Sequence, residues 1–320
     1  MIEILTRDDL SLYPAEFIEE VRNAISIRSL IRRQGEIDGQ QVGVTLEEYR
    51  DFMEERVPEP CPRCHGKGEV LPSLRGVGTI HPSGASRCTL RLFKDVMGAD
   101  RPREEISLSL MITFEIGHAV HALLQRTLHN AANWDLKEEI EKRRGTANKL
   151  RLKTHTQWMD SLSLEFQDEV RVQIIEAMVD GGRTDGVIEV TLWVGSQEVR
   201  VRIVLEIKTM SEKQFIKLTK PKDAHRIQAH GLYATACDAP FVCYLYVVKS
   251  YPHDIEEFVE TYDFDVYNTW YRNKLEPIEE AIETGTEPVA TAGKYECDDC
   301  SYKHGCAQRA GRTTKSRLTR

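Results

Sequence analysis

The sequence lacks the features of a membrane or secreted protein. No apolar run reaches the roughly 18–20 residues that span a bilayer. The N-terminal decapeptide MIEILTRDDL has neither the basic segment nor the apolar segment of a signal peptide. We therefore expect a cytoplasmic protein without membrane contact, whose eight cysteines serve as metal ligands, catalytic groups or core residues and not as disulfides.

Basic residues are in the minority, but their distribution matters more than their number. The net charge is −8, with 14 acidic and seven basic residues in 1–60 and 11 acidic and two basic residues in 254–288. The last fourteen residues carry five bases and no acid. Because a local basic face is enough to attract phosphate, the acidic total does not exclude a nucleic-acid partner.

Length and composition predict a globular α/β protein. The 320 residues, 41% hydrophobic and 29% charged, suit two domains or one elaborated domain. Residues 1–57 are interpreted as an acidic N-terminal helical cap, with docking of a protein partner as the alternative. A Cys- and Gly-rich knuckle is expected at 58–88, the core at 89–253, and an acidic helical stretch, a cysteine cluster and a basic tail at 254–320.

Within the core, the hydrophobic period changes from helical to extended. A helix is predicted at 109–130, with Phe114 and Leu124 near one face. The other elements expected are strands at 170–179, 184–192, 199–209 and 241–248, a turn at 180–183, and a helix at 224–237. This order predicts a mixed sheet with helices on both sides, in which the apolar strand at 241–248 is buried on both faces.

The strand at 199–209 contains the triplet Glu206-Ile207-Lys208. Because side chains alternate along a strand, Glu206 and Lys208 point to one face and Ile207 to the other. Charged side chains within an apolar strand are costly unless they pair or bind a ligand. With Asp185 in the neighbouring strand, two carboxylates suit a hard divalent cation, and the lysine suits the charge that develops on a phosphate. A plain Glu206–Lys208 salt bridge is the alternative.

Two helices place further polar residues before and after this triplet. Gly117 and His121 lie four residues apart on one helix face, where the glycine leaves room for close approach. Gln228 and Tyr233 lie on the helix that follows. The order Gly117…His121, Gly182-Arg-Thr-Asp185, Glu206-Ile207-Lys208, Gln228…Tyr233 resembles the PD-(D/E)XK nuclease superfamily, specifically its RecB-like branch. The resemblance covers roughly residues 80–306.

The resemblance implies a restriction-endonuclease-like core and a deoxyribonuclease that depends on Mg²⁺ or Mn²⁺. It assigns the metal to His121, Asp185, Glu206 and the Ile207 carbonyl, catalysis to the same three side chains with Lys208, and substrate contacts to Gln228 and Tyr233. The branch spaces the last pair by four residues, whereas here they are five apart. A regular helix would separate them by about 140° instead of about 40°, so a π-type bulge is needed to restore the register.

Cys297, Cys300 and Cys306 have the spacing C-x2-C-x5-C, which predicts a metal site. The resemblance extends to iron–sulfur exonucleases of the CRISPR-associated and AddB type, and it supplies Cys88 as the fourth ligand. It implies a [4Fe–4S] cluster with a structural role first and redox sensing second. Zinc would accept the same four sulfurs.

Two further cysteine pairs are interpreted differently. Cys61 and Cys64 form a C-x-x-C knuckle that is a candidate Zn²⁺ site, with His65 or His81 as completing ligands. A reduced pair of thiols on a Gly-rich loop is the alternative. Cys237 and Cys243 flank a turn beside an apolar strand and are expected to be core thiols.

Together these patterns are interpreted as a DNA exonuclease that processes linear or single-stranded DNA ends in recombination or repair. It looks like phage enzymes, and we expect it in a bacterial or phage-infected host cytoplasm. The alternative is a non-catalytic iron–sulfur or zinc protein that binds nucleic acid on the same scaffold. The simultaneous presence of two carboxylates, a histidine and a lysine favours the enzyme, since a scaffold needs none of them.

Overall fold

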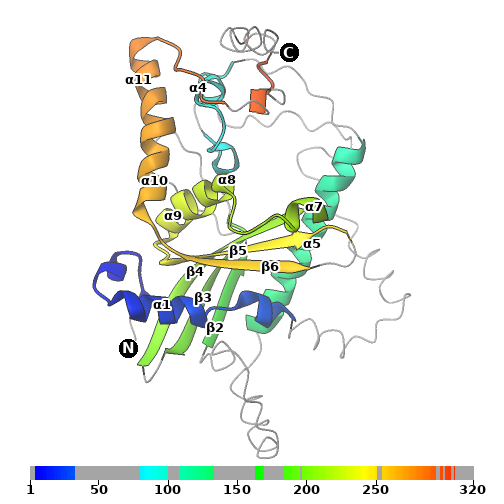
Figure 1. Cartoon of the computed structure of the whole chain (residues 1–320), viewed down its shortest axis with the longest axis vertical. Coiled ribbons are helices and arrows are strands. Elements are labelled where there is room, and N and C mark those ends of the chain that lie inside the picture. Colours follow the sequence, from blue (N-terminus) through cyan, green and yellow to red (C-terminus); the bar gives the residue numbers. More distant parts are fainter. Residues whose placement is uncertain are drawn as a thin grey trace, which may run out of the picture.

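A mixed β-sheet with helices on both faces lies at the centre of the computed structural model, as the sequence predicts (Figure 1). The structure describes residues 4–32, 80–99, 108–132, 163–168, 184–194, 197–250, 254–292, 296–297, 300–303 and 306. None of the helices in these ranges combines the length and the apolar character that a bilayer crossing requires.

The strands follow the order β2-β3-β4-β5-β6, and the short β1 pairs with β4. Their bounds are β1 Ile4–Leu5, β2 Ser163–Asp168, β3 Gly186–Val194, β4 Gln197–Met210, β5 Phe241–Val248 and β6 Ile255–Thr261. β2, β3 and β4 run antiparallel, β5 is parallel to β4, and β6 is antiparallel to β5. Every residue of β5 is buried, which confirms the expectation from its apolar sequence.

Helices lie against both faces of this sheet (Figure 1). The α-helices are α1 Ala15–Ala24, α4 Thr89–Val96, α5 Leu108–Ala132, α7 Glu212–Phe215, α8 Asp223–His225, α9 Thr235–Cys237, α10 Phe264–Trp270 and α11 Glu276–Thr284. The other helical turns are the 3₁₀ turns η1 Asp8–Ser11 and η2 Pro82–Gly84 and the π-helices η5 Arg226–Ala234 and η6 Tyr271–Leu275. α1 and α5 contribute to the core on one face, and η5 contributes to the core on the other.

Alternation along β4 divides its side chains between these two cores. Leu205 and Ile207 are fully buried in the core shared with α1 and α5. Val204 and Met210 are buried on the opposite side, beside Tyr233 of η5. Each such apolar side chain contributes about 1.5–3 kcal/mol, so the orientation of the strand is strongly determined. Glu206 and Lys208 consequently face η5.

The N-terminal region is helical where it is described, as the sequence predicts. Ile18 and Val21 of α1 are buried against the sheet, and residues 27–32 form a further helical turn. The Glu257 carboxylate of β6 accepts the backbone N–H groups of Ile27 at 2.5 Å and Arg28 at 3.2 Å. It thereby satisfies donors that the first turn of a helix leaves unpaired.

Two expectations are corrected by the structure, and a third lies outside the described residues. Residues 255–261 form strand β6 and not part of an acidic helix, because the β-branched and aromatic side chains of this segment pair with the open edge of β5. Phe114 is 49% exposed although Leu124 on the same helix is buried. β3 pairs with 163–168, whereas the strand predicted at 170–179 lies outside the described residues, as do 33–79 and 133–162.

Candidate active site and cysteine pocket

The candidate site lies where β3 begins and β4 continues beyond it. Gly186 pairs with Leu205, so β4 has no β3 partner from Glu206 onward. The backbone N–H of Ile207 instead donates to Asp185 Oδ2 at 2.6 Å. In an antiparallel ladder the N–H and C=O of a residue face the same neighbour, so the Ile207 carbonyl also lies on this open edge.

Helix α5 brings two polar side chains to Asp185. His121 Nδ1 lies 3.2 Å from Asp185 Oδ1, and Gln125 Nε2 donates to the Asp185 carbonyl at 2.8 Å. A Cβ at Gly117 would lie 3.4 Å from Thr209 Oγ1 of β4, which shows how closely the helix approaches the strand there. The predicted Gly117–His121 face therefore meets the predicted carboxylate.

Glu206 is the most buried charged side chain of the site, with 1% of its surface exposed. Its carboxylate forms an ion pair with the Lys208 ammonium, and within the described residues neither oxygen accepts a hydrogen bond of good geometry. Burial raises the pKa of Glu206 to about 7, with Lys208 opposing this shift and the negative charge of Asp185 adding to it. A carboxylate in this position needs a further positive partner to remain ionised.

Asp185 and Lys208 are held in their charged forms by their neighbours. Burial alone would raise the pKa of Asp185, but the His121 hydrogen bond, the charges of Lys208 and His121, and the Ile207 N–H lower it below its usual value. Burial alone would lower the pKa of Lys208, but the Glu206 and Asp185 carboxylates outweigh that effect and raise it. The site therefore presents a carboxylate and an ammonium on one edge of the sheet.

The π-helix η5 resolves the five-residue spacing between Gln228 and Tyr233. Both residues lie within Arg226–Ala234, and Gln228 Nε2 donates to the Tyr233 hydroxyl at 3.3 Å. The π-type bulge that the spacing requires is therefore present, and it extends over the whole segment. Tyr233 is 1% exposed, and burial, then the charge of Glu206, raise its pKa. The Tyr233 hydroxyl thus holds the Gln228 amide through this hydrogen bond.

Several residues near the site were not predicted. Gln125 lies one helical turn after His121, and that i+4 spacing was a signal that could have identified it. Tyr246 of β5 stands opposite Lys208 in the β4–β5 pairing, and its hydroxyl lies 2.8 Å from His225 Nδ1. Tyr246 and His225 lie near Lys208 because β5 pairs with β4, and the sequence of β4 alone does not reveal that pairing.

The donor atoms of this edge fit a hard divalent cation, although no metal site is fully formed. Within the described ranges, no three His, Cys, Asp or Glu side chains are grouped as they would be around one ion. Two carboxylates, an imidazole and a backbone carbonyl are nevertheless available together. Apart from the Lys208 ion pair, the two buried Glu206 oxygens have no hydrogen-bond partner of good geometry among the described residues, a deficit that a Mg²⁺ or Mn²⁺ ion removes.

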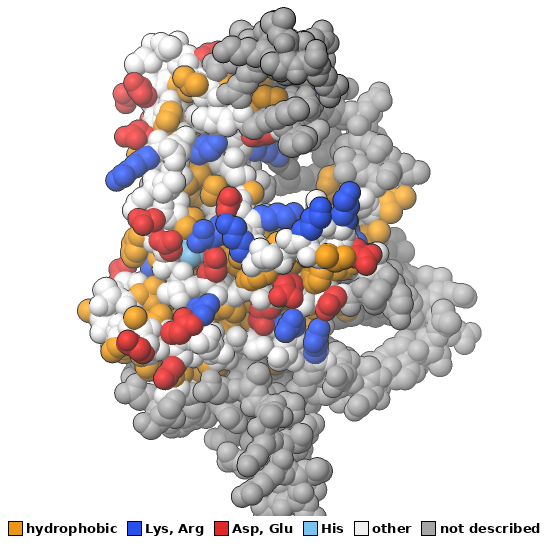
Figure 2. Space-filling view, in the orientation of Figure 1, with side chains coloured by type: hydrophobic (Ala, Val, Ile, Leu, Met, Phe, Trp, Pro, Cys, Tyr) orange, Lys and Arg blue, Asp and Glu red, His pale blue; other side chains and the backbone are white. Residues whose placement is uncertain are grey.

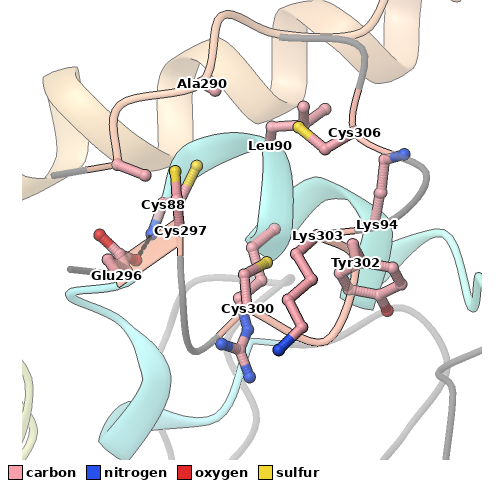
Figure 3. Close-up of a pocket in the computed structure, with 12 residues that line it drawn as sticks. Cys88, Leu90, Lys94, Ala290, Glu296, Cys297, Cys300, Tyr302, Lys303 and Cys306 are labelled. Atoms are coloured by element: carbon pink, nitrogen blue, oxygen red, sulfur yellow. Dashed lines mark hydrogen bonds between the residues drawn. The ribbon is translucent and has the colours of Figure 1, made fainter. Parts of the chain in front are cut away.

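Four cysteines from distant parts of the chain line one pocket between α4 and the C-terminal tail (Figure 3). They are Cys88, Cys297, Cys300 and Cys306. Cys88, Leu90, Ala290 and Ala292 form a buried apolar cluster against which Cys297 and Cys306 pack. Four thiols are the ligands that a [4Fe–4S] cluster or zinc takes, but the thiols as described line the pocket without being grouped around one ion.

Protein contacts hold the two sides of this pocket together. The Cys88 N–H donates to the Glu296 carboxylate, and the Thr89 N–H donates to Thr291 Oγ1 at 3.1 Å. The Lys274 ammonium donates to the Arg87 carbonyl at 2.9 Å. The tail therefore docks on α4 through its own hydrogen bonds, and a metal would add to an arrangement that exists already.

The structure tests only some of the remaining cysteine predictions. Cys61, Cys64 and His65 lie outside the described residues, so the zinc knuckle stays a prediction. His81 Nδ1 lies 2.8 Å from the Ser83 hydroxyl of its own turn. Cys243 is fully buried in the core and Cys237 is partly buried, and burial raises the pKa of both thiols, as expected for core cysteines.

Comparison with known proteins gives distant likenesses. No described protein family and no curated protein matches the sequence. The solved structures similar to this chain include SSO0001, which is 18% identical with a TM-score of 0.41 over 75% of this chain and 91% of that chain. They also include the alkaline exonuclease LHK-Exo from Laribacter hongkongensis, 13% identical with a TM-score of 0.30 over 65% of this chain and 91% of that chain. At these values neither likeness assigns an activity, so function is argued from the site.

Proposed function

We propose that the chain is a divalent-metal-dependent deoxyribonuclease that degrades DNA from its ends. The observation that carries the proposal is the buried Glu206 carboxylate, which lies beside Asp185 and Lys208 where β4 extends past β3 and finds no well-formed hydrogen bond in the described part of the chain. A simple structural salt bridge does not require a second carboxylate, or a histidine from another helix, at the same place.

Each side chain of the site has a role in this proposal. His121, Asp185, Glu206 and the Ile207 carbonyl would hold the cation. When bound, Mg²⁺ or Mn²⁺ supplies positive charge that polarises the phosphodiester and the attacking water.

The remaining side chains orient the substrate and the ligands. Lys208 stabilises the charge that grows on the phosphate, because its ammonium lies on the same strand face as Glu206. Gln125 fixes the backbone of Asp185, and Gln228, oriented by Tyr233, contacts the substrate.

The cysteine pocket is proposed to hold a [4Fe–4S] cluster through Cys88, Cys297, Cys300 and Cys306. The supporting observation is that Cys88 lines the same pocket as three cysteines more than 200 residues away, and that hydrogen bonds already join the two segments. The cluster would fasten the tail to α4. Zinc on the same thiols is the alternative that metal analysis distinguishes.

The activity is tested on labelled linear DNA and on covalently closed circular DNA. Each is incubated with Mg²⁺ or Mn²⁺, with and without chelator. We expect loss of linear DNA only, and no reaction in chelator. Asp185→Asn and Glu206→Gln should abolish cleavage. Glu189→Gln is the matched control, because Glu189 is a carboxylate of β3 that pairs with Arg200 at 2.8 Å, away from the open edge.

Two outcomes would contradict the proposal. Full cleavage by both Asp185→Asn and Glu206→Gln would show that the activity comes from elsewhere. Metal-independent DNA binding without cleavage under any metal would instead select the non-catalytic, nucleic-acid-binding alternative.

A further inference from the structure

Directly after β4, ten residues carry four positive charges and no negative one. The segment 213–222, with the sequence KQFIKLTKPK, contains Lys213, Lys217, Lys220 and Lys222. It is bounded by Glu212 and Asp223. The segment is therefore locally positive in a chain whose net charge is −8.

The lysines of this segment are presented on a packed support. Phe215 and Leu218 pack against the core that contains Tyr244 and Tyr246, and Pro221 is buried. Backbone hydrogen bonds from Phe215 N to the Ser211 carbonyl at 3.0 Å and from Leu218 N to the Phe215 carbonyl at 2.9 Å fix the turn. Phe215, Leu218 and Pro221 thus point inward, whereas Ile216 and all four lysines are exposed.

The exposed lysines line an open surface. A shallow cleft is formed by Gln214, Lys217, Leu218, Thr219, Lys220, Pro221, Lys222 and Asp223. Figure 2 shows Lys and Arg side chains gathered in a band at the level of α7. Within the described part of the chain, no ion pair joins any of the four ammonium groups to a carboxylate. Their charge is therefore available to an external anion.

One end of the segment is fastened beside the candidate active site. The Lys222 N–H donates to the Tyr246 hydroxyl at 3.1 Å, and Tyr246 stands opposite Lys208 in the β4–β5 pairing. Burial, then the charges of Lys208 and Lys222, lower the pKa of the neighbouring His225 to about 4. The row of lysines therefore leads from the surface of α7 to the strand that carries Lys208.

We propose that residues 213–222 form the path along which the phosphodiester backbone of the DNA strand enters the site. The proposal rests on the nuclease function proposed above and names the surface that holds its substrate. Lysine contacts to phosphate are independent of base sequence, so this path suits an enzyme that moves along any strand.

Salt-dependent DNA binding tests the path without relying on cleavage. Anisotropy of a labelled duplex and of a labelled single strand is titrated with full-length protein in chelator at several salt concentrations. Each phosphate contact contributes about 0.9 to the slope of log affinity against log salt on duplex DNA and about 0.7 on a single strand. For Lys217→Gln/Lys220→Gln we expect the slope to fall by about 1.8 on duplex or about 1.4 on a single strand.

The control removes the same number of positive charges elsewhere. Arg32→Gln/Arg272→Gln also replaces two exposed bases, on the N-terminal helical turn and on η6, and should leave the slope unchanged. The single variant Lys220→Gln should lower the slope by about 0.9 on duplex DNA. Because these lysines are exposed, melting curves should match that of the unmodified protein.

The outcomes separate the path from the catalytic proposal. A reduced slope in the lysine variants supports the path even if no metal condition yields cleavage. An unchanged slope in a protein that binds and cleaves DNA overturns the path and leaves the nuclease proposal standing. Failure of the unmodified protein to bind either DNA overturns both.

Discussion

At the scale of single residues, Glu206 and Lys208 illustrate how a costly arrangement indicates a function. They lie two positions apart on one face of β4, and Leu205 before them and Ile207 between them are fully buried. The Lys208 ammonium is the single close cation described for a carboxylate that is 1% exposed. Such a pair is weak evidence of stability, because desolvation of both charges offsets their attraction.

Replacing Lys208 by methionine separates catalysis from stability. Lys208→Met keeps most of the side-chain volume and should retain DNA binding, but the chemical step should slow roughly a hundred- to a thousandfold, equivalent to about 3–4 kcal/mol. Single-turnover cleavage is measured beside a melting curve. A destabilised variant that cleaves normally per folded molecule would reduce Lys208 to a partner of Glu206.

The raised pKa of Glu206 predicts a pH-dependent stability in chelator. Because burial raises the folded-state pKa from 4.5 to about 7, the folded protein binds this proton more tightly than the unfolded chain does. The contribution of Glu206 to stability is therefore fully present below about pH 4.5 and falls as the pH rises through about 7. The difference between these two pKa values corresponds to about 3 kcal/mol in the free energy of unfolding.

The free energy of unfolding in urea at pH 5 and pH 8 measures this effect. Glu206→Gln should gain stability relative to the unmodified protein on going from pH 5 to pH 8, whereas Glu189→Gln should not. Adding Mg²⁺ at pH 8 should stabilise the unmodified protein but not Glu206→Gln. If Glu206→Gln and the unmodified protein differed in free energy of unfolding by the same amount at pH 5 and pH 8, Glu206 would titrate normally. Its environment would then be less buried than described.

At the scale of elements, the site depends on how closely α5 approaches β4. The helix carries His121 and Gln125, and both contact Asp185 only because Gly117 allows the backbone near Thr209. On the other side of the sheet, η5 uses a π-helical turn to align Gln228 with Tyr233. Each helix is thus adjusted locally to bring a polar side chain to one strand.

Substitutions at Gly117 test the importance of this approach. Gly117→Ala places its Cβ 3.4 Å from Thr209 Oγ1, so we expect it to fit and to gain about 0.5–1 kcal/mol from helix propensity. Gly117→Val should push α5 away from β4 and lower cleavage at least tenfold. Ala122→Val, at an exposed position of the same helix, controls for the β-branched side chain. Equal activity of all three variants would show that the approach is not required.

At the scale of the whole molecule, the cysteine pocket joins segments from both ends of the chain. α4 also packs against α10, η6 and α11, where Leu92 and Val96 form a buried cluster with Trp270 and Ile278. The Trp270 indole N–H donates to the Ala85 carbonyl at 2.9 Å. A metal at the cysteines would therefore reinforce an interface that already contains an apolar core.

Metal content and stability test this part of the proposal. Protein purified without oxygen should be brown and contain about four iron atoms per chain, as for one [4Fe–4S] cluster. Cys88→Ser and Cys297→Ser should bleach the colour and expose the tail to proteolysis, whereas Cys237→Ser, outside the pocket, should keep both iron and colour. Colourless protein that contains one equivalent of zinc, lost in the same two variants, would show that the cysteines bind zinc and not an iron–sulfur cluster.

Some features of this protein could be predicted because they depend on local periodicity. Alternation along β4 determines that Glu206 and Lys208 share a face opposite Ile207. The helical period of 109–130 and the apolar sequence of 241–248 specify α5 and β5 nearly to the residue. Residue types alone indicated that carboxylates, a lysine and thiols were available.

Other features were decided only by the tertiary structure, because they depend on which distant segments become neighbours. Residues 255–261 are extended because β5 offers an unpaired edge, a fact that their own acidic sequence does not contain. Gln125 and the lysines of 213–222 became candidates only once α5 and β5 were placed beside β4. Backbone hydrogen bonds and packing across the sheet, which no local period encodes, bring these groups to one edge.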